Sequence, residues 1–429
     1  EIVAAHDRGP LRTVDLSAIP AADRDEARTR IATEVQSSLS VGQARLLRAV
    51  LFTGAGPDTL LVAAHHIAVD TVSWSILLED LATACRQLEA GLPVRLGAKT
   101  TSYRQWAGLV AERAGTVGTE APAPAPLPVD LDDGPDAEQF TEAAEVALPA
   151  ELTDTLLRRT TAAYRTEIND VLLTALARTF AGWTGEPGLV VDVEGHGRDP
   201  FLDDVDLTRT VGWFTSIRPV LLPVPRPDWD SCLKAVKESL RTTSDGPRAT
   251  AQVSFNYLGR LDRPGGDAGR FRLLAEDLGA TRAPGAGRPY LLEITAAVVD
   301  DRLRISLSYS SRRYRRATVT RLAEAFAAAL AAVAEHCTSG ARGVTPSDFP
   351  LAGLPQSTLD TLVAGLGSSP DPIEVGDIAD LYPLSPLQQG MLFRSVYDPG
   401  SQDYLEQNGF VVRGPLDADA FEAAWQLVA

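Results

Sequence analysis

The stretch AAHHIAVDTVSW, residues 63–74, says more about the fold than any other part of the chain. It places His65 and His66 at the end of an apolar run, and the pattern predicts an amphipathic helix that starts just after Asp70. A strand, a tight turn and a helix in this order can hold a catalytic side chain rigidly. The chain has only 5 His in 429 residues, so two adjacent ones suggest a functional site. A metal site or a buried structural pair is the alternative interpretation of this stretch alone.

Size and composition limit the classes of protein that fit. A length of 429 residues predicts two to three folding units, and 45% hydrophobic residues allow sizeable cores. The formal charge of −17 disfavours nucleic acids and anionic membranes as partners. Cys85, Cys232 and Cys337 are far apart and show no zinc spacing, which favours a reducing, cytoplasmic setting. The first residues do not resemble a signal peptide, and no apolar run is expected to approach the roughly 20 residues of a membrane span.

The periodicity predicts two blocks of mixed helices and strands. In the first block, residues 23–40 are predicted as a helix, 44–52 and 58–66 as strands, and 102–115 as a further helix. A Pro-rich segment, 121–139, is expected to cross between two lobes. In the second block we expect helices at 151–164, 168–183 and 317–337, strands at 188–195, 213–224 and 250–259, and a hairpin over 291–310 that turns near Asp300 and Asp301.

Five motifs, in this order along the chain, carry a resemblance to a known family. They are His–His–x–x–x–Asp with Ser73–Trp74, INDVLLTAL (168–176), EGHGRD (194–199), RTVGWFTSIRPV (209–220) and FNYLGR (255–260). Together they resemble the condensation superfamily of the nonribosomal peptide synthetases. Amide-forming members usually carry Gly after the Asp; Thr71 stands there, and Ser73–Trp74 is similar to the epimerization subfamily. The tail from Ile378 resembles the opening of a following condensation domain.

The resemblance implies an α/β fold of two lobes, each similar to chloramphenicol acetyltransferase, with the active-site tunnel between them. It also implies the division of the chain. The expected parts are an N-terminal lobe (1–120, lacking the start of the domain), the crossing segment (121–139), a C-terminal lobe (140–350), a linker (351–377) and the N-terminal fragment of a condensation domain (378–429).

The activity implied by the resemblance is that of an amino-acid epimerase, an isomerase. Such a domain inverts the α-carbon, L to D, of an aminoacyl or peptidyl group carried as a thioester. His66 matches the family's catalytic histidine and is the candidate for one proton carrier. Glu194, at the end of a predicted strand, is the candidate for the other. The helix N-terminus beside His66 favours a neutral, basic imidazole.

Supporting roles are expected for neighbouring residues. His65 is expected to orient or pack, and Asp70 to cap the helix or pair with Arg198. Trp74 is expected to line the substrate channel or pack in the core. Ser73 is a further supporting residue, and Asn256 and Tyr257 either line the site near the thioester or are a buried structural amide and phenol. Trp213 and Phe214 are expected to pack on the tunnel floor, and His196 to shape a turn.

Cofactors and partners follow from the same resemblance. No directly bound cofactor and no metal are expected, because HHxxxD lacks a third ligand with sensible spacing and no phosphate-binding glycine loop is present. The substrate would hang on the 4′-phosphopantetheine of an upstream carrier domain, with a condensation domain downstream in the same chain.

Two departures from the family pattern keep other functions open. The Gly–x–Gly–Tyr–Gly segment usually found before FNYLG is missing, as is the family's opening Gln- and Trp-containing segment. A noncatalytic carrier-docking or scaffold domain, decayed from an epimerase, is therefore one alternative. An amide-forming condensation domain is the other.

Overall fold

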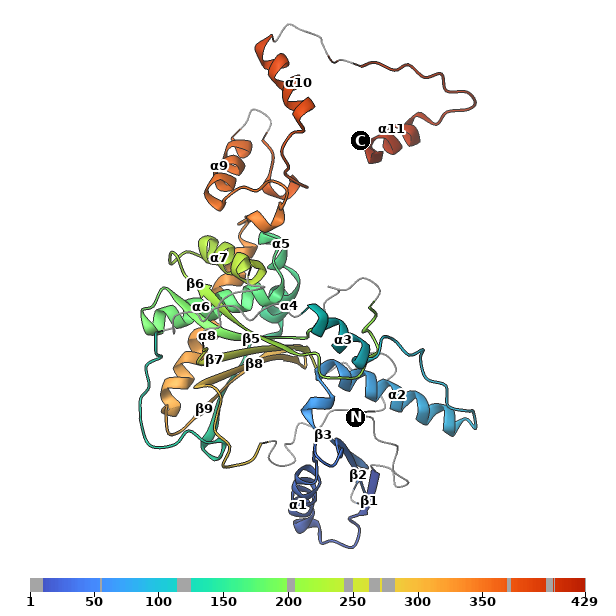
Figure 1. Ribbon diagram of the computed structural model, residues 1–429, viewed down its shortest axis with the longest axis vertical. Coiled ribbons are helices and arrows are strands. Elements are labelled where there is room, and N and C mark those ends of the chain that lie inside the picture. The colour runs from blue at the N-terminus through green and yellow to red at the C-terminus, as the bar shows by residue number, and fades with distance from the viewer. Residues whose placement is uncertain are drawn as a thin grey trace.

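The computed structural model describes residues 11–54, 56–113, 125–198, 205–242, 250–261, 271, 282–368, 372–398, 404 and 406–428. Within them the chain forms two α/β units followed by a helical C-terminal part (Figure 1). The first unit contains a three-stranded sheet and the second a six-stranded sheet.

The first unit is built on a small sheet with one helix against it. β1 (Leu11–Asp15) pairs in parallel with β2 (Leu47–Thr53), which pairs antiparallel with β3 (Thr59–Ala64). The short η1 (Ala21–Asp23) leads into α1 (Arg24–Ser37), whose buried residues pack on β2. Residues 66–113 then form η2 (His66–Ala68), α2 (Thr71–Glu89) and α3 (Tyr103–Arg113). The helices and strands predicted for this unit are thus present, and the strand β1 was not anticipated.

The described part of the crossing segment lies along the second unit. Leu127 N donates to Gln252 Oε1 at 2.7 Å, and Asp130 N donates to the carbonyl of Arg313 at 3.0 Å. The segment ends in η3 (Glu138–Phe140). Residues 125–137 are therefore attached to the second unit, which is the second lobe of the fold.

The second unit is organised around a sheet with the strand order β4-β9-β8-β7-β5-β6. β5 pairs in parallel with β7, and β7 in parallel with β8; the other neighbours are antiparallel. The strands are β4 (Thr141–Ala147), β5 (Gly188–Gly195), β6 (Ser216–Pro223), β7 (Val253–Arg260), β8 (Leu292–Val299) and β9 (Arg302–Ser310). β8 and β9 form the predicted hairpin, and Asp300 and Asp301 at its tip both adopt positive φ, as a tight two-residue turn requires.

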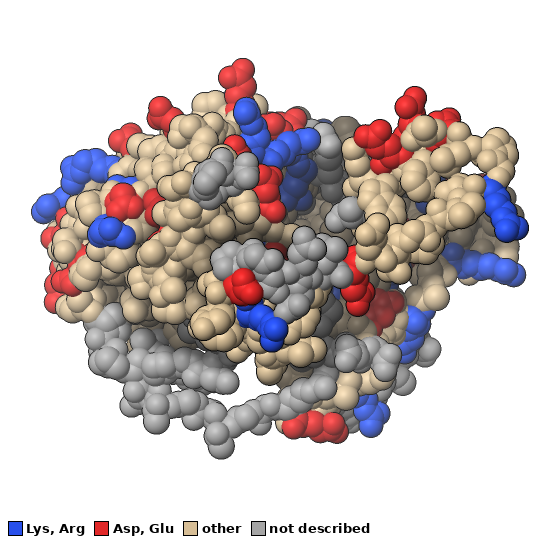
Figure 2. Space-filling view, turned by 90° about the horizontal axis from the view of Figure 1, so that it is seen from above, with Lys and Arg blue, Asp and Glu red and all other residues tan. Residues whose placement is uncertain are grey.

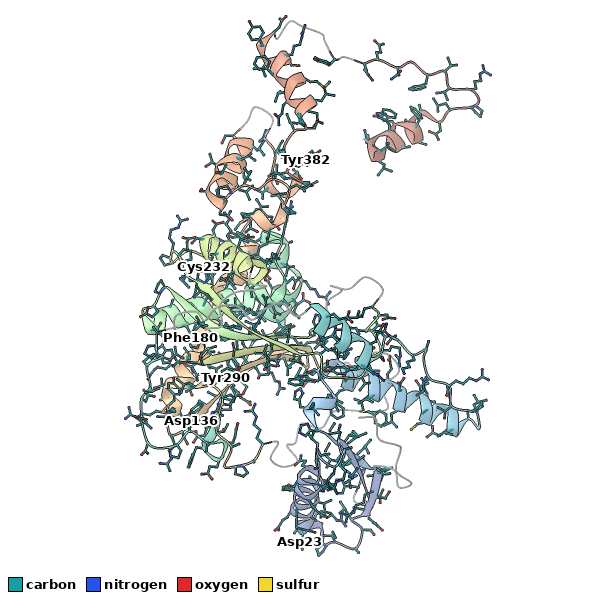
Figure 3. The ribbon with its side chains drawn as sticks, viewed as in Figure 1. Asp23, Asp136, Phe180, Cys232, Tyr290 and Tyr382 are labelled. Carbon is teal, nitrogen blue, oxygen red and sulfur yellow. The ribbon has the colours of Figure 1, made fainter. Side chains whose placement is uncertain are left out.

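Helices pack on the sheet through one large apolar core. The helices of this unit are α4 (Ala150–Arg158), α5 (Thr161–Tyr164), α6 (Ile168–Thr184), α7 (Trp229–Thr242) and α8 (Arg316–Thr338). Side chains alternate along each strand, so Val191 and Val193 of β5 enter this core and Asp192 and Glu194 lie on the opposite face. In Figure 3, Phe180 lies on the helix side of the sheet and Tyr290 on the other. The helix α7 and the strand β4 were missed by the sequence analysis.

One of these helices has the length and composition of a membrane span. Among the described helices, α8 is long and apolar enough to cross a bilayer by those criteria. Its apolar residues, including Phe326 and Leu330, are instead buried in the core of the second unit. The expectation that no apolar run reaches such a length was therefore wrong for α8, and the burial explains its hydropathy.

Acidic and basic side chains are interspersed on the face shown in Figure 2.

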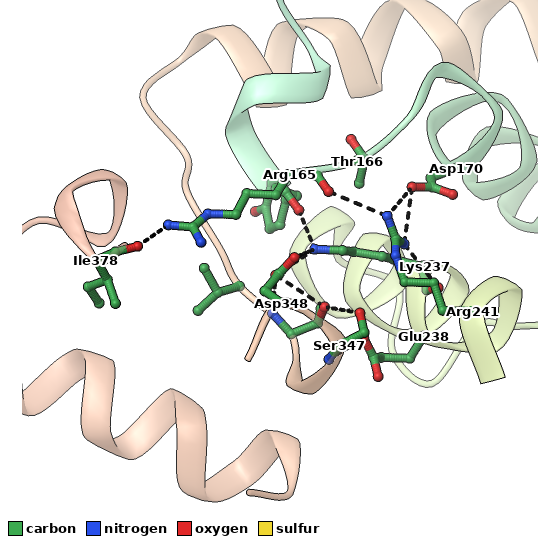
Figure 4. Close-up of polar contacts among 12 residues, drawn as sticks. Arg165, Thr166, Asp170, Lys237, Glu238, Arg241, Ser347, Asp348 and Ile378 are labelled. Carbon is green, nitrogen blue, oxygen red and sulfur yellow. Dashed lines mark hydrogen bonds and ion pairs between the residues drawn. The ribbon is translucent and has the colours of Figure 1, made fainter. Parts of the chain in front are cut away.

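The chain after α8 remains fastened to the second unit. It forms η5 (Pro346–Asp348), α9 (Gln356–Gly367) and η6 (Val375–Asp377) around a small core of Val344, Phe349, Leu359 and Ile378. Figure 4 shows the attachment: Lys237 Nζ, with no exposed side-chain surface, bonds both oxygens of Asp348 at 2.6 Å, and Arg165 donates to the Ile378 carbonyl.

The last two helices are largely solvent-exposed. α10 (Pro386–Tyr397) and α11 (Ala418–Val428) leave large apolar side chains uncovered, among them Phe393 (70% exposed) and Trp425 (65% exposed). The expected linker at 351–377 thus contains a helix that packs on its surroundings. The boundaries drawn from the sequence remain predictions.

Candidate functional site

The two histidines lie in a short turn between β3 and α2. His65 caps this turn, because its Nδ1 accepts a hydrogen bond from the backbone N–H of Ile67 at 3.2 Å. That contact suits the orienting role predicted for His65. His66 begins the turn and is exposed. The helix α2 then starts at Thr71, as the sequence predicted.

Asp70 combines the two structural tasks expected of it. It is the N-cap of α2 and accepts bonds from the backbone N–H of Ser73 at 2.7 Å and from the Ser73 hydroxyl at 2.8 Å. It also forms an ion pair with Arg198, whose Nη2 lies 2.9 Å from Asp70 Oδ1. The side chains of Asp70 and Arg198 are 3% and 8% exposed, so the pair is shielded from water. This ion pair joins the first lobe to the second.

Arg198 also organises the backbone of the loop between β5 and β6. Its Nη1 donates to the carbonyls of Leu207 and Thr210, each at 2.9 Å. Its guanidinium lies over the ring of Phe214, 4.2 Å from the centroid. All of these contacts fix residues 205–214, which we call the 205–214 loop.

Ser73 fastens the same loop to α2. The buried Ser73 hydroxyl lies 3.1 Å from the backbone N of Gly212, which donates to it, and 3.0 Å from the Gly212 carbonyl. A Cβ on Gly212 would come within 2.3 Å of the Tyr103 ring. Position 212 therefore requires glycine, because α3 approaches too closely for a Cβ.

A second set of contacts between the lobes was not foreseen. Arg209 donates to Glu79 at 2.8 Å and also bonds Asp80, both on α2. The backbone N–H of Thr101 donates to the Asp206 carbonyl at 2.9 Å. A cavity of about 340 Å³ borders this contact, lined by Glu79, Asp80, Thr83, Arg86, Gly97 and Arg209. The only sequence signal was an (i, i+1) acid pair on a helix, which does not identify a partner.

The 205–214 loop brings Trp213 to His66. The two rings meet edge to face, with centroids 5.8 Å apart and planes inclined at 61°. The Trp213 carbonyl accepts a hydrogen bond from the Tyr103 hydroxyl at 3.0 Å. Phe214, which is 2% exposed, packs on Tyr103 and Trp106. Phe214 thus packs in the interior, while Trp213 is 38% exposed and contacts the imidazole.

Glu194 stands on the polar face of β5 and is half-buried. Asn256 on β7 donates from Nδ2 to Glu194 Oε2 at 2.6 Å. Burial raises the pKa of Glu194 above its usual value, and the charge of His66 opposes that rise. The Glu194 carboxyl thus lies within reach of the His66 charge although the two residues come from different lobes.

The other predicted site residues lie on β7, on α2 and in the turn after β5. Tyr257 is half-buried next to Asn256, and burial raises the pKa of its phenol. Trp74 is half-buried on α2. His196 shapes the turn after β5, because its Nδ1 accepts from the backbone N–H of Arg198 at 3.0 Å. Gly197 adopts φ +62°, and a Cβ there would lie 1.7 Å from the Phe214 carbonyl oxygen.

Charged groups beside Glu194 were missed by the sequence analysis. The Tyr290 hydroxyl donates to Asp192 at 2.7 Å, and Arg288 and Arg282 each bind Glu293 at 3.0 Å. Arg282, Arg288 and Tyr290 come from residues 282–290, a segment that carries no recognisable motif. In the described residues, no three His, Cys, Asp or Glu side chains are grouped as metal ligands would be. The missing Gly–Tyr segment concerns a stretch whose residues 243–249 lie outside the described part of the chain.

Comparison with known proteins gives a consistent result. Residues 2–249, more than half of the chain, match the family described as Condensation domain. One of the linear gramicidin synthase proteins of Brevibacillus parabrevis is 40% identical over 457 residues, which cover 98% of this chain and 6% of that protein. The chain thus spans only a small fraction of this curated relative.

Solved structures support the same family and the two-lobed fold. The crystal structure of the epimerization domain from the third module of tyrocidine synthetase B is similar, with a TM-score of 0.68 and 31% identity, over 77% of this chain and 80% of that one. The first condensation domain of the calcium-dependent antibiotic synthetase shares the fold, with a TM-score of 0.54 and 22% identity, over 76% of this chain and 75% of that one. The resemblance and the fold class drawn from the motifs are therefore confirmed. The chain belongs to the condensation-domain family and is a condensation-superfamily domain of a nonribosomal peptide synthetase.

Proposed function

We propose that this domain epimerizes the α-carbon of an aminoacyl or peptidyl thioester carried by a peptidyl carrier domain. The observation that carries the proposal is geometric: the Asp70–Arg198 pair joins the two lobes, the first lobe presents an exposed His66 against Trp213, and the second holds a half-buried Glu194 through Asn256. Inversion requires a proton to leave one face of the α-carbon and another to arrive on the opposite face. Two proton-handling groups from opposite sides suit that task. The similarity to a solved epimerization domain supports the same choice within the family.

The roles of the two groups follow from their surroundings. His66 is exposed and lies within a turn that precedes the N-terminus of α2, so its imidazole is open to a substrate and, when neutral, can accept the α-proton. Burial favours the protonated form of Glu194, so this carboxyl can deliver a proton to the opposite face. In the reverse direction the two groups exchange roles. Asn256 holds one carboxyl oxygen of Glu194 and so fixes its orientation.

The proposal includes the partners and the setting of the reaction. The substrate arrives on the 4′-phosphopantetheine arm of an upstream carrier domain, so the prosthetic group is part of the substrate. The product passes to a condensation domain that begins near residue 378, and the reaction takes place in the cytoplasm. No directly bound cofactor takes part in the proton transfers.

The direct test uses the full chain with a carrier domain loaded with one L-amino acid or peptide. Chiral analysis of the released acid is expected to show the D-isomer, together with solvent deuterium at the α-carbon. His66→Ala and Glu194→Gln should abolish inversion. Glu145→Gln is the matched control, because Glu145 is an exposed carboxylate on β4 of the same sheet. Retained L-configuration without deuterium uptake would refute the proposal.

Two alternatives are separated by further arms of the same assay. The fold shared with a condensation domain keeps amide formation as a candidate, and amide product from donor- and acceptor-loaded carriers would identify it. Carrier binding with neither inversion nor amide formation would identify a docking domain. Thr71 after Asp70, in place of the Gly typical of amide-forming members, favours epimerization.

A further inference from the structure

The contact between Trp213 and His66 is built by residues from both lobes. Gly212 is held by Ser73, the Trp213 carbonyl is held by Tyr103, and the edge-to-face ring contact has a centroid separation of 5.8 Å. A hydrogen bond therefore fixes the backbone on each side of the indole. The position of Trp213 relative to His66 is determined by the same framework that joins the lobes.

The exposure of Trp213 distinguishes it from a packing residue. The next residue, Phe214, is 2% exposed and packs against Tyr103, Trp106 and Arg198. Trp213 is 38% exposed, so much of its surface lies outside the interior. A large apolar side chain held rigidly in a partly exposed position beside an imidazole suits a role at the site. The centroid separation of 5.8 Å also lies within the roughly 6 Å over which an aromatic face attracts a cation.

We infer that Trp213 is a positioning residue for the proposed epimerization: its indole holds the imidazole of His66 in one orientation and stabilises the imidazolium formed when His66 accepts the α-proton. This inference rests on the proposed function. In the proton-removal step the α-C–H bond breaks and the proton goes to a ring nitrogen of His66. The electron pair of that bond remains on the substrate as the enolate.

The other charged and titratable groups near His66 act differently from Trp213. Glu194, on β5, interacts with His66 electrostatically from the second lobe. His65 uses its Nδ1 to accept from Ile67 N. Asp70 and Arg198 neutralise each other in a buried pair. Within the described residues, Trp213 is the aromatic side chain with a ring contact to His66.

The first experiment measures the contact itself, by fluorescence, on the full chain without substrate. A protonated imidazole quenches the emission of a nearby indole. Subtracting the spectrum of Trp213→Phe from that of the wild type leaves the emission of Trp213. This emission is expected to lose intensity as the pH falls and His66 becomes protonated. His66→Gln should abolish that titration while Trp213 still emits. Trp183→Phe is the control, since Trp183 on α6 contacts Phe180 and Tyr314 in the second-lobe core.

The second experiment measures the consequence for the reaction. Trp213→Leu is expected to lower kcat about 2- to 30-fold with little change in KM, because the imidazolium loses its aromatic partner. The acidic limb of the pH–rate profile should also differ between Trp213→Leu and the wild type, because the imidazolium has lost its aromatic partner. Trp213→Phe keeps an aromatic ring and should recover most of kcat.

The outcomes separate the inference from the proposed function. A wild type that inverts substrate but shows no pH-dependent Trp213 emission overturns the inference alone. Equal kcat values and pH profiles for Trp213→Leu, Trp213→Phe and the wild type also overturn it. A wild type that shows the pH-dependent Trp213 emission but exchanges no α-proton refutes the proposed epimerase activity. In that case Trp213 contacts His66 but has no role in epimerization, so the catalytic part of the inference is also refuted.

Discussion

Asp70 on the first lobe and Arg198 on the second form a buried ion pair, with Arg198 Nη2 2.9 Å from Asp70 Oδ1 and 3.0 Å from Oδ2. Asp70 also caps the helix that follows His66, and Arg198 holds the loop that carries Trp213. One ion pair thus sets the position of the histidine turn relative to the second lobe. Asp70 therefore has a structural role next to His66, the proposed proton carrier.

Removing the charge of Asp70 should destabilise the protein strongly. Asp70→Asn retains a good N-cap but leaves the Arg198 guanidinium buried without a counter-ion. We expect a loss of about 3–5 kcal/mol in the free energy of unfolding, measured by urea denaturation. Asp154→Asn, which removes an exposed (i, i+4) pair with Arg158, should cost less than about 1 kcal/mol. Equal losses for the two variants would contradict the structural role of the Asp70–Arg198 pair.

Adding one methyl group at Gly212 should disturb the site. The new Cβ in Gly212→Ala would lie within 2.3 Å of the Tyr103 ring, so the 205–214 loop or α3 must shift. We expect a cost of about 1–3 kcal/mol and a changed environment of Trp213, measured by urea denaturation and by Trp fluorescence. Gly108→Ala is the matched control on α3, with no atom within 4 Å of its new Cβ, and should raise stability slightly. A tolerated Gly212→Ala with unchanged fluorescence would argue against a closely packed loop.

Much of the fold could be predicted because the patterns are local. The alternation in β5 and the cap at Asp70 are readable from neighbouring residues, and both are present. α7 was missed although its apolar residues Leu233 and Val236 follow helical spacing and are fully buried. Its N-terminal neighbour is a Pro-rich stretch (residues 223–227), which concealed its start.

The motifs supplied the candidate site residues and the Asp70–Arg198 pair, but not the other contacts among them. His66, Glu194 and Asn256 were selected from motifs, but the bond from Asn256 to Glu194 depends on the strand order β7-β5. The pairing of β7 with β5 brings together two residues that are 62 positions apart in the sequence, and no local sequence pattern predicts such a contact. The same reason applies to Arg209 with Glu79, which are 130 positions apart.

The burial of Glu194 should be visible in the pH dependence of stability. Its pKa is raised in the folded protein, so the native state holds this proton at a pH where the unfolded chain, with a pKa of about 4.3, has lost it. The free energy of unfolding therefore falls as the pH rises from the unfolded pKa through the raised native value. Glu194→Gln removes this contribution, so the variant should gain stability relative to the wild type across that window. Urea denaturation between pH 4 and pH 8 measures the difference, and Glu145→Gln should show none. A constant difference for Glu194→Gln would contradict the raised pKa.

Changing Asn256 should alter the carboxylate that it holds. The Asn256 amide nitrogen lies 2.6 Å from Glu194 Oε2, so Asn256→Asp removes this donor and puts a second carboxyl beside Glu194, which raises the pKa of Glu194 further. We expect inversion to slow about tenfold or more at neutral pH and the limb of the pH–rate profile that belongs to Glu194 to move to higher pH. Asn408→Asp, in the exposed tail, is the control. An unchanged profile would mean that Asn256 does not act through Glu194.

Deuterium uptake by each stereoisomer tests the two-sided proton transfer most directly. The L- and D-forms of one carrier-bound substrate are incubated separately in deuterated water with the wild type, His66→Ala and Glu194→Gln. The wild type should label and invert both forms. Each variant should lose inversion yet still label one form, and the two variants should label opposite forms, because each retains the group that faces one side of the α-carbon. Both variants labelling the same form, or either one still inverting the substrate, would contradict the account.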